Sequence, residues 1–213
     1  ISQKANPVHH ATALWMWVAI IGLGLSACQQ QTPELEAPAR SKTMSGGLGI
    51  LNYTDEATDE VYVDGSWASG VTAHNSTMGA GSASVPRKWD PNYTLKVVWT
   101  TSCPYPECDK PPVKHERQVR PEPYQVYGNG GIAQIWVAFF PDGDVKIYPT
   151  RVGIGHKDFP DGLIWPVKEC YNKDPCNPLC HPNLRLGEKY KFPLRCKSDP
   201  RVMGLESNRV TFD

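Results

Sequence analysis

Cysteines are the residues of this chain whose type and spacing indicate chemistry most directly. Six of them fall into a close pair and a C-terminal group, namely Cys103, Cys108, Cys170, Cys176, Cys180 and Cys196. Such thiols either form disulfides or, together with His181, bind zinc. We expect disulfides and no metal, because the sequence has no Cys-x-x-Cys pair and other features indicate an oxidising compartment. A plausible arrangement pairs Cys103 with Cys108 and places two bridges in the C-terminal group, but spacing does not fix the connectivity.

The seventh cysteine, Cys28, ends a segment of a different character. Residues 1–10 are polar with one lysine, and residues 11–27 are apolar and uncharged. A basic start, an apolar run and a small-residue end are typical of a secretory signal peptide. The run is at the short limit for a membrane span of about 20 residues, so an N-terminal anchor helix is the alternative.

Leu25-Ser26-Ala27-Cys28 resembles a bacterial lipobox. The resemblance implies cleavage before Cys28, which then becomes the lipidated first residue of the mature chain. Gln29 follows, whereas Asp at this place in the enterobacterial pattern retains a lipoprotein in the inner membrane. We therefore expect a signal peptide over residues 1–27, a lipid-anchored flexible tether over residues 28–46, and a location on the periplasmic face of the outer membrane.

Catalytic motifs are missing from the sequence. There is no HExxH, GxSxG, P-loop or GxGxxG pattern. His156-Lys157-Asp158 has the letters of the phospholipase D signature, but that signature needs HxK with an Asp several residues later. Lys+Arg and Asp+Glu are both 22, so no net positive charge favours nucleic acid. We expect a protein that is not an enzyme and has no cofactor, and an unrecognised periplasmic enzyme is the weaker alternative.

Because catalytic motifs are missing, we expect exposed aromatic and polar side chains to contact another protein. Two polar segments, residues 65–84 and 153–161, are the candidate contact loops, and their candidate binding residues are Trp67, His74, Asn75, His156 and Asp158. The alternative is that the tryptophan belongs to the core and that the histidines are ordinary surface or turn residues.

Alternating apolar residues predict the strands that must position these groups. The expected strands are residues 49–53, 61–63, 95–99, 135–140 and 145–148. Residues 135–140 are apolar at every position, which is typical of a central strand buried on both faces. Asp142-Gly143 predicts the hairpin turn that follows. The proline-rich stretch of residues 103–123 is expected to be a long loop.

The composition supports many short elements joined by turns, since the 213 residues include 20 Pro and 18 Gly. No helical stripe of three turns is evident in the mature chain. We therefore expect a mainly β fold with antiparallel sheets over residues 47–162, as a two-layer sandwich, with a barrel as the alternative. Residues 163–213 are expected to form a cysteine-rich, loop-rich extension that is stapled by disulfides and packed on that domain.

Four segments in order resemble a known family. They are Gly49-Ile50-Leu51-Asn52-Tyr53-Thr54-Asp55, Val61-Tyr62-Val63-Asp64-Gly65-Ser66-Trp67, Pro86-Arg87-Lys88-Trp89-Asp90-Pro91 leading into Leu95–Trp99, and Gly155-His156-Lys157-Asp158-Phe159-Pro160. The family is a group of proteobacterial lipoproteins of unknown function, some of which are immunity proteins to type VI secretion effectors of the phospholipase D type. The similarity covers residues 47–160. Members often have two adjacent cysteines where this chain has Ser82-Ala83-Ser84.

The resemblance implies a membrane-anchored immunity protein that binds a lipase toxin in the periplasm. Its partners would be the cognate toxin and, through the lipid on Cys28, the membrane. The alternative is a general envelope lipoprotein with a structural or assembly role.

Overall fold

The computed structural model describes residues 41–103, 110–125, 131–181, 184, 189–205 and 210–212. The predicted signal peptide, Cys28, Gln29 and most of the predicted tether lie outside the described residues, as does Cys108. Within the described residues, no helix is both long enough and apolar enough to cross a membrane.

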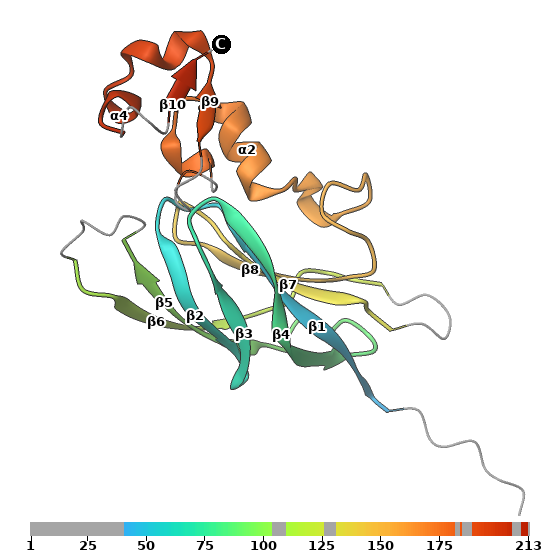
Figure 1. Cartoon of the computed structure of the whole chain (residues 1–213). Coiled ribbons are helices and arrows are strands. Elements are labelled where there is room, and N and C mark those ends of the chain that lie inside the picture. Colours follow the sequence, from blue (N-terminus) through green and yellow to red (C-terminus); the bar gives the residue numbers. More distant parts are fainter. Residues whose placement is uncertain are drawn as a thin grey trace, which may run out of the picture. The chain divides into compact units, whose positions relative to one another are not determined.

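Two four-stranded sheets form the β domain (Figure 1). In the first sheet the spatial order is β4 (Asn75–Pro86), β1 (Thr43–Asn52), β7 (Gln134–Phe139) and β8 (Val145–Thr150). In the second sheet the order is β3 (Ser66–Val71), β2 (Ala57–Val63), β5 (Leu95–Ser102) and β6 (Val113–Val119). All neighbours within these two sheets are antiparallel except β1 and β7, which run parallel. The mainly β, sandwich-like fold with antiparallel sheets is confirmed.

The core lies between the inner faces of the two sheets. Alternation places Val61, Val63, Leu95 and Val97 of the second sheet in this layer, and all four are fully buried. The first sheet contributes Ile50 and the other inward-facing apolar residues of β1 and β7 to the same layer.

The outer face of the first sheet is covered by the segment that follows β8. Ile154 and Phe159 of this segment pack on Trp136, Ala138 and Tyr148 in a second apolar cluster. Strand β7 is therefore buried on both faces, which confirms the central strand expected from its continuous apolar run.

The two edges between the sheets differ. At one edge β3 and β4 approach so closely that a Cβ on Gly79 would lie 2.5 Å from the Ala68 carbonyl oxygen. Glycine is required at this close approach of two backbones. At the other edge, β6 and β8 themselves form no ladder among the described residues, and one isolated bridge joins Ile147 on β8 to Pro121, which follows β6. The sandwich is thus closed along β3 and β4 and parts between β6 and β8.

Three local expectations were wrong. The segment 65–84, expected to be a contact loop, consists mainly of β3 and β4. Strand β6 lies within residues 103–123, which were expected to be a loop. Strand β1 begins at Thr43, so the last four residues of the predicted tether, residues 43–46, are strand. In each case backbone pairing with a neighbouring strand overrides a weak local pattern.

Short helices and strands form the C-terminal extension. They are α2 (Pro166–Lys173), η3 (Pro178–Cys180), β9 (Tyr190–Phe192), η4 (Leu194–Ser198), α4 (Pro200–Met203) and β10 (Val210–Phe212). The short helix η2 (Pro160–Gly162) comes just before the extension, in the segment over the first sheet. Strands β9 and β10 pair in parallel, and Phe192, Cys196 and Val202 form a small core of their own. Disulfides join Cys170 to Cys180 and Cys176 to Cys196, which confirms the stapled C-terminal region. Cys103 is also disulfide-bonded.

Two contacts connect the start of the extension to the first sheet. The Tyr53 hydroxyl donates a hydrogen bond of 2.8 Å to the Ile164 carbonyl oxygen. The Trp165 ring meets Trp136 edge to face, with 6.1 Å between the ring centroids. Burial raises the pKa of Tyr53, so the phenol stays protonated and keeps donating this bond.

Candidate functional site

A cleft of about 520 Å³ opens where the two sheets part. It lies at the end of the sandwich where β1 leaves the first sheet. Its walls come from the loop after β1, the end of β5, the middle of β6 and the hairpin between β7 and β8. The lining residues are Thr54, Asp55, Glu56, Thr58, Trp99, Thr101, His115, Glu116, Arg117, Phe139, Phe140, Pro141, Gly143, Asp144 and Val145.

Stacked aromatic rings form one wall of the cleft. Trp99 and His115 face each other directly across β5 and β6, and their rings stack with centroids 4.9 Å apart and planes 18° apart. The Phe139 ring lies against Trp99 at 5.3 Å. His115 Nε2 is 3.0 Å from the Thr101 hydroxyl, which fixes the imidazole plane. Trp99 is nearly buried, whereas His115 is only partly buried. The imidazole is therefore the part of this aromatic wall that faces the opening of the cleft.

Charged side chains line the mouth of the cleft. Arg117 on β6 reaches across to the hairpin, where its Nη1 donates a hydrogen bond of 3.0 Å to the Gly143 carbonyl oxygen. The same nitrogen is 3.9 Å from a carboxylate oxygen of Asp144. Glu116 is ion-paired with Lys96 at 2.8 Å. The side chain of Asp55 is 75 % exposed at this mouth.

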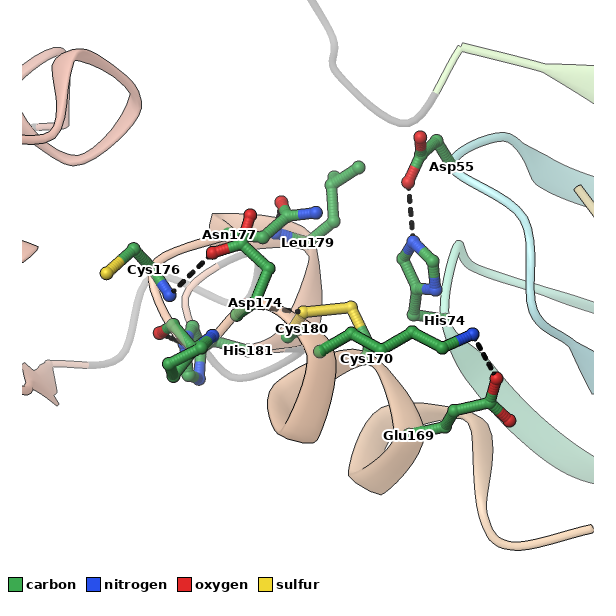
Figure 2. The surroundings of a disulfide bond; sticks show 12 residues. Asp55, His74, Glu169, Cys170, Asp174, Cys176, Asn177, Leu179, Cys180 and His181 are labelled. Carbon is green, nitrogen blue, oxygen red and sulfur yellow. Dashed lines mark hydrogen bonds and ion pairs between the residues drawn. A yellow bond between two sulfur atoms is a disulfide. The ribbon is translucent and has the colours of Figure 1, made fainter.

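A second cavity, of about 220 Å³, shares Asp55 and Pro141 with the cleft. The His74 imidazole is hydrogen-bonded to the Asp55 carboxylate and joins the turn between β3 and β4 to the loop after β1 (Figure 2). Helix α2 contributes Glu169 and the disulfide-bonded Cys170 to the lining of the same cavity. The His74 side chain is only 13 % exposed, so this candidate binding residue is packed within the turn between β3 and β4.

The predicted binding residues occupy three separate places. Trp67 lies on β3 opposite Tyr62 and is 48 % exposed on the outer side of the second sheet. His74 and Asn75 are adjacent where β4 begins, and the Asn75 amide oxygen accepts a bond from the Ser76 amide.

His156 and Asp158 lie in the segment over the first sheet. There the His156 Nδ1 accepts a hydrogen bond from the Asp158 amide at 3.2 Å. Within the described part of the chain, no hydrogen bond, ion pair or ring contact connects these two residues to Trp67 or His74. The candidate residues therefore form no single site, and only His74, through Asp55, contacts the cleft end of the sandwich.

Sequence reasoning missed the residues that line the cleft. Trp99 was expected in a strand, but its partner His115 was expected in a loop, so their stacking could not be anticipated. The signal that could have found it is the run Val113–Val119, which is long enough for a strand and apolar at both ends.

Binding is the chemistry that this arrangement supports. The four cysteines of the extension are paired as disulfides, so they are not available as zinc thiolates. Among the described residues, no group of three or more His, Cys, Asp or Glu side chains is placed to hold a metal ion. An aromatic wall with charges at its rim is typical of a surface that recognises a polar or charged group of a partner.

A domain of unknown function is present in the chain. Residues 51–147 match the family described as "Protein of unknown function (DUF3304)". Every residue that lines the cleft falls within this match, whereas the disulfide-stapled extension lies beyond it. No curated protein and no solved structure matches the chain.

Proposed function

We propose that this chain is a membrane-anchored periplasmic lipoprotein that acts as an immunity protein. It binds a type VI secretion lipase effector of the phospholipase D type and blocks access to its active site. The observation that carries the proposal is the order of features along the chain. A lipobox-like Leu25-Ser26-Ala27-Cys28 precedes a β domain that matches a family of unknown function over residues 51–147.

Three further features support this proposal. The two disulfides of the extension suit an oxidising compartment such as the periplasm. A lipid anchor would concentrate the protein at the membrane that such a toxin attacks. Because the local concentration is then high, a modest intrinsic affinity for the toxin is enough. Neutralisation needs a complementary surface with a few buried anchors and no chemistry of its own, and the cleft and Trp67 provide exposed aromatic and charged groups for it.

Co-purification with the product of the adjacent gene tests the proposal. The full chain is expressed with its signal peptide under oxidising conditions, extracted in neutral detergent and mixed with that product. We expect a stable complex and loss of phospholipid hydrolysis in a vesicle assay. If a folded, disulfide-bonded protein neither binds nor inhibits, the proposal fails and a structural or assembly role in the envelope is favoured.

Trp67→Ala tests one contact predicted from the sequence. The ring is half exposed on β3, so its removal leaves the core intact while an anchor of this size contributes about 2 kcal/mol or more when it is buried by a partner. Met78→Ala is the matched control, because Met78 is an exposed apolar side chain on the neighbouring β4. Unchanged affinity of the Trp67 variant would remove this residue from the interface.

A further inference from the structure

We infer that the cleft between β6 and the β7–β8 hairpin is a docking site for an arginine side chain of the partner protein. The inference rests on the proposed function and deepens it, because it assigns the surface that the toxin occupies. It also departs from the contact loops predicted from the sequence, since none of Trp67, Asn75, His156 and Asp158 lines this cleft.

The shape of the cleft suits one side chain and a short stretch of backbone. Its volume of about 520 Å³ is within the usual range for sites that enclose a small group, which is roughly 300–1,000 Å³. The Trp99 ring contacts both the His115 ring and the Phe139 ring, so the wall is formed before any partner arrives. Phe140 stacks on Tyr53 with planes 2° apart, which fixes a further aromatic residue of the lining.

Negative charge dominates the mouth of the cleft. Asp55, Glu56 and Asp144 contribute carboxylates, whereas Glu116 is compensated by Lys96 outside the lining. Arg117 is the one arginine or lysine among the residues that line the cleft, and its Nη1 is already bonded to the Gly143 carbonyl oxygen. Asp55 is hydrogen-bonded to His74, and no ion pair involves Glu56 in the part of the chain that the structure describes. Asp144 lies 3.9 Å from the same Arg117 nitrogen. Asp55, Glu56 and Asp144 nevertheless outnumber this one arginine, so an incoming cation meets an excess of negative charge at the mouth.

An arginine satisfies both features of the site. A guanidinium group is planar and weakly hydrated, stacks on aromatic faces, and binds carboxylates through paired hydrogen bonds. The half-buried His115 ring provides the face, and Glu56 and Asp144 provide carboxylates at the rim. An enzyme that acts on phosphodiesters needs cationic groups around its active site, so a complementary inhibitor surface is acidic.

Peptide binding tests the inference without the toxin. The probes are an acetylated and amidated Gly-Gly-Arg-Gly-Gly peptide and the same peptide with citrulline, which has nearly the same shape but no charge. The full chain is labelled with 5-fluorotryptophan, and the Trp99→Phe variant identifies the fluorine resonance of Trp99. We expect the arginine peptide to shift this resonance saturably, with an affinity at least fivefold higher than that of the citrulline peptide.

Single substitutions then locate the charges. Glu56→Gln and Asp144→Asn should each weaken binding of the arginine peptide at least threefold, whereas Glu60→Gln on the outer face of the second sheet should leave it unchanged. Equal binding of the two peptides, or no shift of the Trp99 resonance, overturns the inference.

The toxin assay separates this inference from the proposed function. If the arginine peptide binds in the cleft while the adjacent gene product does not bind the chain, the docking site stands and the immunity function fails. If the toxin binds and is inhibited, but Glu56→Gln and Asp144→Asn leave its affinity unchanged, the immunity function stands and the docking site is wrong.

Discussion

The Tyr148 hydroxyl donates a hydrogen bond of 2.8 Å to the Asp161 carboxylate and thereby fastens the segment over the outer face of the first sheet to β8. Lys146 Nζ reaches the same oxygen at 2.9 Å. These two bonds lower the pKa of Asp161, while burial together with the bond to Asp161 raises the pKa of Tyr148. A charged acceptor and a neutral phenol are therefore the stable combination near neutral pH.

Tyr148→Phe should lower the free energy of unfolding by about 1 to 2 kcal/mol, because a partly buried hydrogen bond to a charged group is lost while the ring still fills its site. Urea unfolding measures the change. Tyr171→Phe is the control, since Tyr171 is exposed. Equal losses in the two variants would mean that the bond to Asp161 contributes nothing specific.

Gly49→Ala should be destabilising by about 1 to 3 kcal/mol, since a Cβ at this position would lie 2.6 Å from two carbons of the Trp136 ring. That ring is buried and also contacts Trp165 edge to face, so it has little room to move. Gly153→Ala is the matched change, because nothing lies within 4 Å of its Cβ position. In thermal unfolding the Gly49 variant should melt at a clearly lower temperature than the Gly153 variant. Similar melting temperatures would contradict the packing described for β1.

Loss of the Cys176–Cys196 disulfide should lower the stability of the extension more than loss of the Cys170–Cys180 disulfide. The two bridges span 20 and 10 residues of sequence, and doubling a closed loop adds about 0.6 kcal/mol to its entropic effect. Each pair is replaced by serines, and proteolysis within the extension is followed in urea. After complete reduction of the two variants and the wild-type protein, the difference in stability between the variants should vanish. A difference that persists would not come from the disulfides.

His181 should make the extension sensitive to acid. It is buried among Tyr171, Tyr190 and Phe192, and desolvation lowers its pKa, although the bond to the Pro175 carbonyl oxygen opposes this. Because the folded-state pKa lies below the unfolded value of about 6.5, the stabilisation is complete above that value and is lost as pH falls below it.

Unfolding midpoints between pH 7 and 5 measure this effect. His181→Gln should reduce the fall of the unfolding midpoint with decreasing pH. His156→Gln should not reduce it, since the His156 side chain is 48 % exposed. A decline that is equally steep in the His181 variant would assign the acid sensitivity to other groups.

Cys28→Ser should abolish attachment of a lipid to the chain. Metabolic labelling with a fatty-acid analogue, followed by membrane fractionation, measures attachment and location. Gln29→Asp should leave the label in place and move the protein from the outer to the inner membrane fraction. A labelled Cys28→Ser protein would contradict the lipobox, and an unlabelled wild-type protein in the membrane fraction would favour an N-terminal anchor helix.

Strands with a clear apolar pattern could be predicted from the sequence, and strands without one could not. Residues 135–140 are apolar throughout, and β7 is indeed central. Strand β4 consists mostly of small residues, and β6 has charged or polar residues on both faces because it is an edge strand. Their existence depends on pairing with β1 and β5, which is information that no local window contains.

The candidate site was less predictable than the fold. Asp55, Trp99, His115 and Asp144 come from four separate segments, and the pairing of β5 with β6 and the parting of the sheets bring them to one cleft. Trp67 and His74 stood out because they occur in polar, glycine-rich sequence, but that composition reflects the close approach of β3 and β4. Residue type was informative for the cysteines, whose pairing depends on two short loops within one extension.

Strand β1 also determines how the domain would carry a load. The chain enters it at Thr43 and leaves it at Asn52, beside Phe139 of the cleft, and it is flanked by β4 on one side and β7 on the other. A pull between an anchor ahead of Thr43 and a partner held in the cleft would act along this strand. Hydrogen bonds to both neighbours would then have to break together in shear, and not one after another as in peeling. The β4–β1–β7 ladder would thus carry the load between the proposed anchor and the proposed partner.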